Sequence, residues 1–235
     1  MIFAAGLGTR LKPITDTRPK ALVEINGRTL LEIVITKLKT AGFERIVVNV
    51  HHFSAMIIDY LKTNNKFGID IRVSDESDFL LDTGGGIRKA RPLFDHDSPV
   101  LIHNVDIISN ADIIQLYENI GDNDAMLLMS NRETSGRYLL CDDNDKLRGW
   151  TNIKTGELKP QGLKTEGLNK CAFNGIHVMT PQLLDSMDPW PEKFSIIDFY
   201  LSSCAQYKIK AAFQEGLKII DVGKIDSLEK AKALC

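Results

Sequence analysis

The sequence lacks the features of several protein classes. Its 235 residues include only 4 cysteines, with no CxxC pair, which excludes a zinc knuckle or a dithiol redox motif. Widely spaced cysteines are typical of a reduced cytoplasmic protein, so we expect a cytoplasmic location. No apolar run approaches the ~18 residues of a membrane-spanning helix. The first residues also lack the basic start and long apolar core of a signal peptide, so we expect no membrane partner.

The sequence also lacks an excess of charge of either sign. Lys and Arg together number 29, Asp and Glu number 31, and the formal net charge is −2. A strongly basic chain is typical of proteins that bind nucleic acid or anionic membranes, and we expect neither partner here. The hydrophobic fraction of 43% and charged fraction of 26% are ordinary for a globular protein. An anionic substrate must therefore be met by a local site.

The hydrophobic pattern of residues 1–131 predicts a parallel α/β sheet. Apolar runs expected to form strands alternate with helical stripes, and Ser54 is expected to cap the second helix. The expected strands span 2–5, 45–50, 69–74, 99–105 and 125–130, and the expected helices 29–40, 54–61, 86–93 and 111–119. This alternation is typical of a doubly wound, mostly parallel, Rossmann-like sheet with helices on both faces.

The pattern becomes mixed in residues 132–235. We expect a hairpin of strands 138–141 and 146–150, further strands at 171–179, 208–213 and 217–220, and helices at 181–186, 196–205 and 227–233. No repeat, low-complexity tract or linker divides the chain. We therefore predict a single domain over residues 1–235, with a parallel half and a mixed half.

A glycine-rich turn follows the first expected strand. Such a turn lets backbone N–H groups approach a phosphate closely. It lacks the third glycine of the dinucleotide fingerprint and the Gly-Lys-Ser/Thr ending of a P-loop. Arg10 and Lys20 can clamp a polyphosphate, and a solvated basic loop is the competing interpretation. The residues of this turn are Ala5, Gly6, Leu7, Gly8, Thr9 and Arg10.

The run Gly6-x-Gly8-Thr9-Arg10-Leu11-x-Pro13-x-Thr15, followed by Pro19-Lys20-Ala21-Leu22, resembles the signature of sugar-1-phosphate nucleotidyltransferases. The resemblance implies a glycosyltransferase-A-like fold and an enzyme that joins a nucleoside triphosphate to a sugar 1-phosphate, releasing pyrophosphate. It implies that the glycine turn wraps the nucleotide, that Arg10 contacts the β- and γ-phosphates, and that Lys20 lies near the α-phosphate. Residues 1–131 would bind nucleotide and residues 132–235 the sugar.

Two aspartates follow apolar segments near the ends of expected strands. Asp106 follows 99–105 and Asp221 follows 217–220, at the strand ends where open α/β sheets bind ligands. From position alone, a turn or helix-cap role is the alternative for each. The resemblance implies that both carboxylates bind Mg²⁺ and that Asp106, with Arg10 and Lys20, is catalytic. Most relatives read Asn-Gly-Asp where this chain has Asn104-Val105-Asp106.

The segment Leu81-Asp82-Thr83-Gly84-Gly85-Gly86 is the third anchor of the resemblance. Successive glycines before a helix permit close backbone approach to a flat ligand, and a flexible loop is the alternative. The resemblance places Thr83, Gly84, Gly85 and Asn104 at the nucleotide. The Thr-Gly-Gly-Gly form is closest to N-acetylmuramate 1-phosphate uridylyltransferases and favours UTP. The alternatives are GTP with mannose 1-phosphate, CTP with phosphocholine, and a catalytically silent regulator that binds nucleotide sugars.

The sugar-side segments are less specific. The resemblance assigns sugar contacts to Gly136, Asn174, Gly175 and Ser195. The aspartate that the uridylyltransferases carry near Gly136 is absent, so the sugar stays open between cell-wall and other glycan precursors. We expect a monomer or homodimer and no trailing acyltransferase domain. The cluster of Asp75, Glu76 and Asp78 is expected to be a solvated loop.

Overall fold

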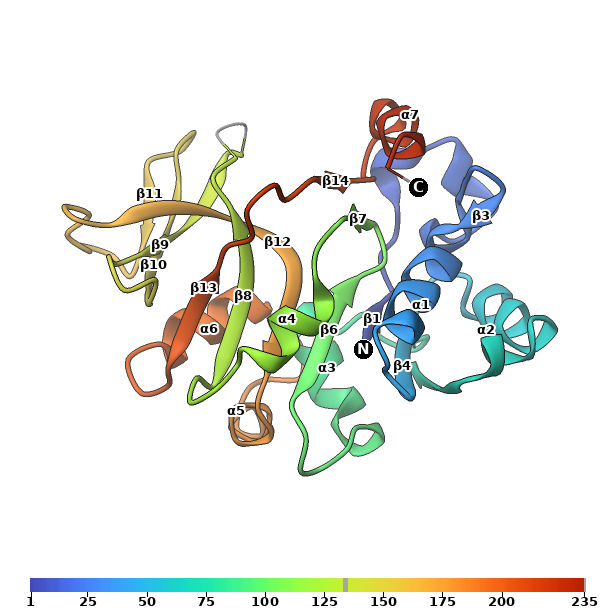
Figure 1. Cartoon of the computed structure of the whole chain (residues 1–235), viewed down its shortest axis with the longest axis horizontal. Coiled ribbons are helices and arrows are strands. Elements are labelled where there is room, and N and C mark those ends of the chain that lie inside the picture. The colour runs from blue at the N-terminus through green and yellow to red at the C-terminus, as the bar shows by residue number, and fades with distance from the viewer. Residues whose placement is uncertain (133–134, 235) are drawn as a thin grey trace.

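The computed structural model describes residues 1–132 and 135–234. It is a mixed α/β structure built on a 10-stranded sheet, ordered β11-β10-β9-β12-β6-β1-β4-β5, with β8 and β13 attached beside β12 (Figure 1). The sheet strands are β1 Ile2–Phe3, β4 Arg45–Val50, β5 Asp70–Asp75, β6 Val100–Asn104, β8 Ala125–Ser130, β9 Arg137–Cys141, β10 Leu147–Asn152, β11 Glu157–Lys159, β12 Asn169–Met179 and β13 Ile209–Ala212. The predicted fold class is confirmed.

The N-terminal half supplies the parallel part of the sheet. Strand β1 pairs in parallel with β4 and β6, and β4 pairs in parallel with β5. The carboxyl ends of these strands therefore meet at one edge, where ligands bind in open α/β sheets. Smaller pairs join β2 (Glu24–Ile25) to β3 (Arg28–Thr29) and β7 (Ile107–Ser109) to β14 (Ile219–Asp221).

The C-terminal half is joined to this sheet through β12. This strand of 11 residues pairs antiparallel with β6, β8 and β9. Strands β9 and β10 form the predicted hairpin, and β13 adds to β8 in parallel. The predicted change from a parallel to a mixed arrangement is therefore observed.

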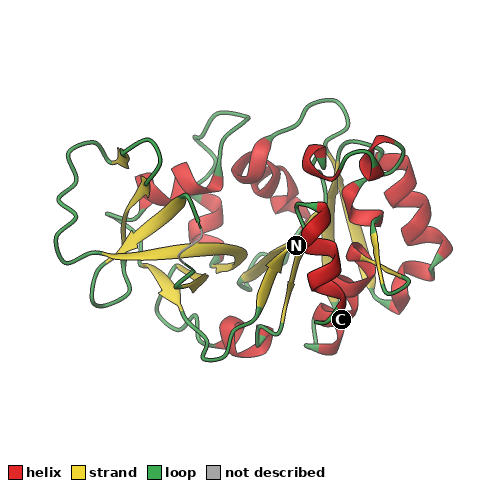
Figure 2. Ribbon diagram, turned by 90° about the horizontal axis from the view of Figure 1, so that it is seen from above, coloured by secondary structure: helices red, strands yellow, loops and turns green. Residues whose placement is uncertain are grey.

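Helices cover the sheet, and most of them lie on the side of the N-terminal half (Figure 2). Helix α1 begins as predicted, because Thr29 Oγ1 accepts a hydrogen bond at 3.0 Å from the backbone N–H of Glu32. Its apolar stripe, from Leu30 to Leu38, is buried in the core. The helices are α1 Leu30–Thr40, α2 Ser54–Thr63, α3 Asp82–Ala90, α4 Ile113–Glu118, α5 Pro181–Asp185, α6 Ile196–Ser203 and α7 Ile225–Lys232.

Three local predictions were wrong. The N-cap of α2 is Phe53 rather than Ser54, and it has no side-chain cap. Helix α7 begins at Ile225, before the expected start at residue 227. Helix α3 begins at Asp82, so its glycines lie inside the helix rather than before it. The glycines of α3 pack against other segments, as described below, and this packing outweighs the low helix propensity of glycine.

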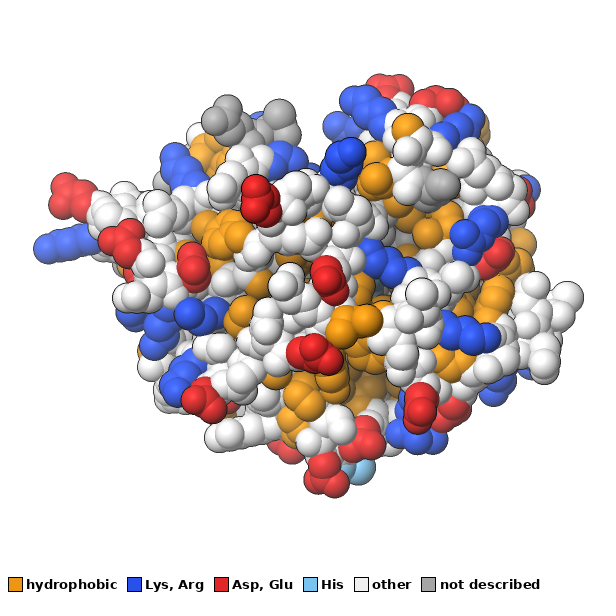
Figure 3. Space-filling view, viewed as in Figure 1, with side chains coloured by type: hydrophobic (Ala, Val, Ile, Leu, Met, Phe, Trp, Pro, Cys, Tyr) orange, Lys and Arg blue, Asp and Glu red, His pale blue; other side chains and the backbone are white. Residues whose placement is uncertain are grey.

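The surface carries charges of both signs. On the face drawn in Figure 3, basic and acidic side chains are interspersed rather than gathered into one patch. Within residues 1–132 and 135–234, no helix is long and apolar enough to cross a membrane.

Candidate active site

The glycine turn has a defined shape. Gly8 has a left-handed conformation (φ 66°), which favours glycine, and it precedes the short helix Thr9–Leu11. The Thr15 hydroxyl donates to the Gly8 carbonyl oxygen at 2.8 Å, and Leu11 is fully buried beneath the turn. Ala5 and Gly6 line a cavity of about 370 Å³ at the carboxyl edge of the sheet. The turn is therefore a fixed wall of this cavity.

The cations of the turn region meet the two predicted metal ligands. Lys20 Nζ donates to Asp106 Oδ2, and the two side chains are only 10% and 20% exposed. Arg10 Nη2 lies 3.8 Å from Asp221 Oδ2 in a more exposed pair. The four groups predicted to act on the phosphates thus lie together, although they are far apart in sequence.

Asp106 and Asp221 come together because two strands pair beside them. In the β7–β14 pair, Asp221 stands opposite Ile107, and the Val222 N–H donates to the Asp106 carbonyl oxygen at 2.8 Å. Both carboxylates line a smaller cavity of about 220 Å³. The β7–β14 pair therefore fixes both side chains at one place.

The donors here fit a magnesium ion. Among the described residues, buried Oδ1 of Asp221 has no hydrogen-bond partner. Mg²⁺ is usually held by one or two carboxylates together with substrate phosphates and waters. No group of three or more His, Cys, Asp or Glu residues suited to a metal occurs in the described part of the chain. The pair of Asp106 and Asp221 thus suits an ion that completes its shell from the substrate.

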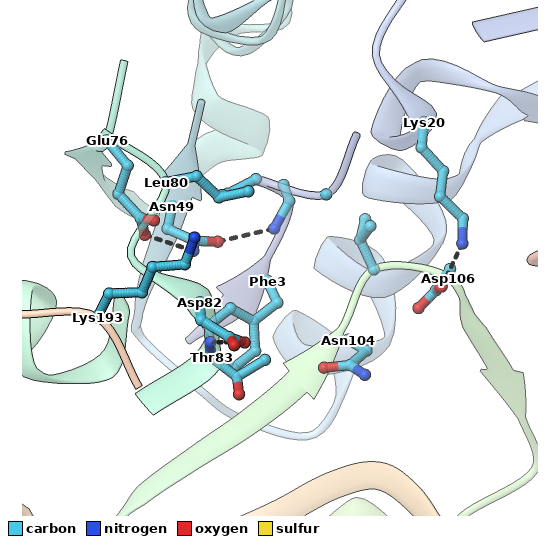
Figure 4. A pocket seen from close by; sticks show the side chains of 14 residues that line it. Phe3, Lys20, Asn49, Glu76, Leu80, Asp82, Thr83, Asn104, Asp106 and Lys193 are labelled. Carbon is cyan, nitrogen blue, oxygen red and sulfur yellow. Dashed lines mark hydrogen bonds and ion pairs between the residues drawn. The ribbon is translucent and has the colours of Figure 1, made fainter. Parts of the chain in front are cut away.

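The other end of the 370 Å³ cavity carries a buried polar network that the sequence did not reveal. Asn49 Oδ1 accepts from the Ala4 N–H at 2.8 Å, and Asn49 Nδ2 donates to Glu76 Oε1 at 2.7 Å. Glu76 is fully buried, not solvated as predicted, and burial raises the pKa of its carboxyl group. Figure 4 shows these groups and Lys193 on the side of the cavity away from Lys20 and Asp106.

The three glycines of α3 serve packing. A Cβ on Gly84 would lie 2.3 Å from the Phe194 ring, and one on Gly85 would lie 2.3 Å from the Glu192 carbonyl oxygen. A Cβ on Gly86 would lie 2.8 Å from Glu76 Oε1. Neither Gly84 nor Gly85 lines the cavity, whereas Thr83 and Asn104 do.

The predicted sugar residues are divided between two neighbouring cavities, one of about 650 Å³ and the smaller one beside Asp221. Ser195 lines the larger cavity, together with the two neighbours of Gly136 in sequence, Ser135 and Arg137. Gly136 itself lies against Lys154. Asn174 and Gly175 line the smaller cavity beside Asp221, and buried Nδ2 of Asn174 has no partner among the described residues. An unpaired buried donor is costly, which is expected of a group that awaits a ligand.

Three residues of the turn lie outside the cavity walls. Leu7 is 45% exposed, and neither Gly8 nor Thr9 lines any of these cavities. They are adjacent to the wall formed by Ala5 and Gly6. Their predicted nucleotide contacts stay predictions.

A family model described as nucleotidyl transferase matches residues 1–235. The chain belongs to the nucleotidyl transferase family. Its curated relatives include an N-acetylmuramate α-1-phosphate uridylyltransferase of Caulobacter vibrioides, 30% identical over 92% of this chain and 88% of the relative. A protein of the same name from Neisseria meningitidis serogroup B is 27% identical over 100% of this chain and 96% of the relative.

The fold is shared with solved structures of other proteins. HddC from Yersinia pseudotuberculosis has a TM-score of 0.80 and 23% identity, over 99% of this chain and 96% of that one. A putative glucose-1-phosphate thymidylyltransferase from Bacillus anthracis has a TM-score of 0.81 and 18% identity, over 99% and 93%. The family match and the curated relatives identify the chain as a sugar-1-phosphate nucleotidyltransferase, a family whose substrates are a nucleoside triphosphate and a sugar 1-phosphate.

Proposed function

We propose that the protein transfers the uridylyl group of UTP to a sugar 1-phosphate in a Mg²⁺-dependent reaction. The sugar phosphate oxygen attacks the α-phosphorus, the bond to the β-phosphate oxygen breaks, and pyrophosphate leaves. The products are a UDP-sugar and pyrophosphate. N-acetylmuramate 1-phosphate is the first acceptor to test, because the two near-full-length relatives named above carry that name.

The observation that carries the proposal is the convergence of Arg10, Lys20, Asp106 and Asp221 at one edge of the sheet. Phosphoryl transfer depends on positioning and on neutralising charge rather than on covalent catalysis. In this proposal, Lys20 neutralises an α-phosphate bound beside Asp106, and Arg10 neutralises the phosphates that leave as pyrophosphate. When bound between Asp106 and Asp221, Mg²⁺ would supply Lewis-acid stabilisation of phosphoryl charge.

The test is pyrophosphate release with purified protein, with and without Mg²⁺, over a panel of nucleotides and acceptors. The panel pairs UTP with N-acetylmuramate, N-acetylglucosamine and glucose 1-phosphates, GTP with mannose 1-phosphate, and CTP with phosphocholine. We expect release with UTP and a sugar 1-phosphate, abolished by EDTA. Preferred turnover of GTP or CTP overturns the nucleotide assignment. A nucleotide-induced rise in melting temperature without turnover of any pair identifies a silent binding protein instead.

A further inference from the structure

A segment of the C-terminal half, residues 192–196, is tied to the wall of the nucleotide cavity. The Gly84 N–H donates to the Phe194 carbonyl oxygen at 2.9 Å. The Ile196 N–H donates to Thr83 Oγ1 at 2.9 Å. Because Gly84 and Thr83 lie in the first turn of α3, the segment is held at a fixed place beside the cavity.

This close approach depends on the absence of side chains in α3. The space that a Cβ on Gly84 would need is filled by the Phe194 ring, and that of Gly85 by the Glu192 carbonyl oxygen. Phe194 is itself buried, with its ring centroid 4.9 Å from that of Trp190. The glycines therefore let a sugar-side segment reach the nucleotide cavity.

The segment brings Lys193 to the end of the cavity that faces away from the phosphate-binding groups. Lys193 lines this cavity with Asn49, Glu76 and Leu80, and Figure 4 shows it opposite Lys20 and Asp106. Its Nζ lies 5.6 Å from the centroid of the Phe79 ring. Within the described part of the chain, no carboxylate forms an ion pair with Lys193, so its donors are available to a ligand.

The chemistry of this end suits particular nucleobases. A lysine ammonium group has three donors and no acceptor. Uracil O4 and guanine O6 accept hydrogen bonds at positions where cytosine and adenine carry amino donors. An ammonium group here attracts the carbonyl oxygens of uracil and guanine and repels the amino groups of cytosine and adenine.

We propose that Lys193 is a nucleobase-specificity residue that donates to uracil O4 or guanine O6 and so favours UTP and GTP over CTP and ATP. The inference rests on the proposed function, because it assumes that a nucleoside triphosphate fills this cavity with its phosphates at Lys20. It adds a recognition role for a residue outside the glycine-rich motifs.

The experiment compares wild type with Lys193→Met for kcat/KM with UTP and CTP, and for the melting shift that each nucleotide causes without acceptor. We expect the UTP-to-CTP ratio of kcat/KM to fall about tenfold, as when a charge-assisted hydrogen bond is lost. Lys193→Arg should retain most of the preference. The matched control Lys62→Met, on the exposed face of α2, should leave the ratio unchanged.

A second variant tests the placement of the segment. Gly85→Ala should lower the same ratio, because its Cβ would displace Glu192 and the lysine that follows it. A Lys193→Met ratio within about twofold of wild type overturns the inference. If wild type turns over no nucleotide, the proposed function fails. The melting shifts then decide the inference separately, and an unchanged UTP shift in Lys193→Met overturns it.

Discussion

The candidate active site contains two pairs of oppositely charged side chains, Lys20 with Asp106 and Arg10 with Asp221. Lys20 and Asp106 are both largely desolvated, so removing one partner leaves the other as a poorly solvated charge. The more exposed pair of Arg10 and Asp221 stabilises the fold little. Asp106 is therefore best tested with an amide of the same shape, which keeps the side-chain volume and removes the charge.

Asp106→Asn should lower the rate of pyrophosphate release by ~10²–10⁴, because the charge that holds the proposed Mg²⁺ is lost. The measurement is kcat at saturating UTP and acceptor over a series of Mg²⁺ concentrations. The exposed residue Asp122, mutated to Asn, is the control. A residual rate within about threefold of wild type would contradict the assignment of Asp106.

Asn174 allows a separate test of the acceptor side. Its unpaired Nδ2 is expected to donate to the sugar or its phosphate. Asn174→Ala should raise KM for the sugar 1-phosphate about tenfold, the cost of one hydrogen bond, and leave KM for the nucleotide unchanged. Steady-state kinetics with each substrate varied in turn distinguishes the two. An equal rise in both KM values would assign Asn174 a general structural role.

Burial of single residues was the part of the site least open to prediction. Glu76 stands among acidic neighbours in sequence, which is typical of a solvated loop. Its buried carboxylate is compensated by hydrogen bonds from Asn49 Nδ2, on the distant strand β4, and from the nearby Leu81 N–H. The place of Asp106 was easier to predict, because it follows an apolar run at the carboxyl edge of the sheet, whereas Asp221 is brought beside it by the separate β7–β14 pair.

Elements with an unmixed apolar pattern were predicted closely. The bounds of β4 and β8 match the expected 45–50 and 125–130, because both are mostly apolar segments whose residues are largely buried on both faces. The start of α3 was missed because three glycines disfavour a helix locally. Its helical start depends on contacts with Phe194 and Glu192, which lie more than a hundred residues away.

Gly84→Ala should therefore destabilise the protein despite the better helix propensity of alanine. The new Cβ would overlap the Phe194 ring, and overpacking of a core costs about 1–3 kcal/mol, against about 1 kcal/mol gained in propensity. The measurement is the urea midpoint at constant m. Gly6→Ala is the control, since nothing lies within 4 Å of its Cβ. A midpoint for Gly84→Ala equal to or above wild type would contradict this packing role.

The molecule as a whole contains two histidines sealed in its centre. Burial lowers the pKa of His103 to about 4 and that of His177 to about 3, from 6.5. They lie on the adjacent strands β6 and β12, and His177 Nδ1 is hydrogen-bonded to the Tyr200 hydroxyl. Both histidines are neutral in the folded protein at neutral pH.

Both histidines should therefore bind protons when the protein unfolds at acidic pH, so that unfolding becomes easier as the pH falls. Each histidine has a folded pKa below its unfolded value of 6.5. Its contribution to the free energy of unfolding is therefore fully present above pH 6.5 and is lost as the pH falls toward 4 for His103 and toward 3 for His177. Between pH 6.5 and about pH 4.5 we expect the free energy of unfolding to fall by about 2 kcal/mol per histidine. Urea titrations over this range measure it. The curve for His177→Gln should be flatter, and one parallel to wild type would contradict the prediction.

The strand β12 has a consequence for fragments of the chain. It is hydrogen-bonded to β6, β8 and β9, so a single backbone segment joins the parallel part of the sheet to the mixed part. A chain cut at residue 131 would leave the β6 edge without its partner, and uncovered edges promote aggregation. Chimaeras that exchange acceptor preference between relatives should therefore exchange loops around the sugar cavity rather than whole halves.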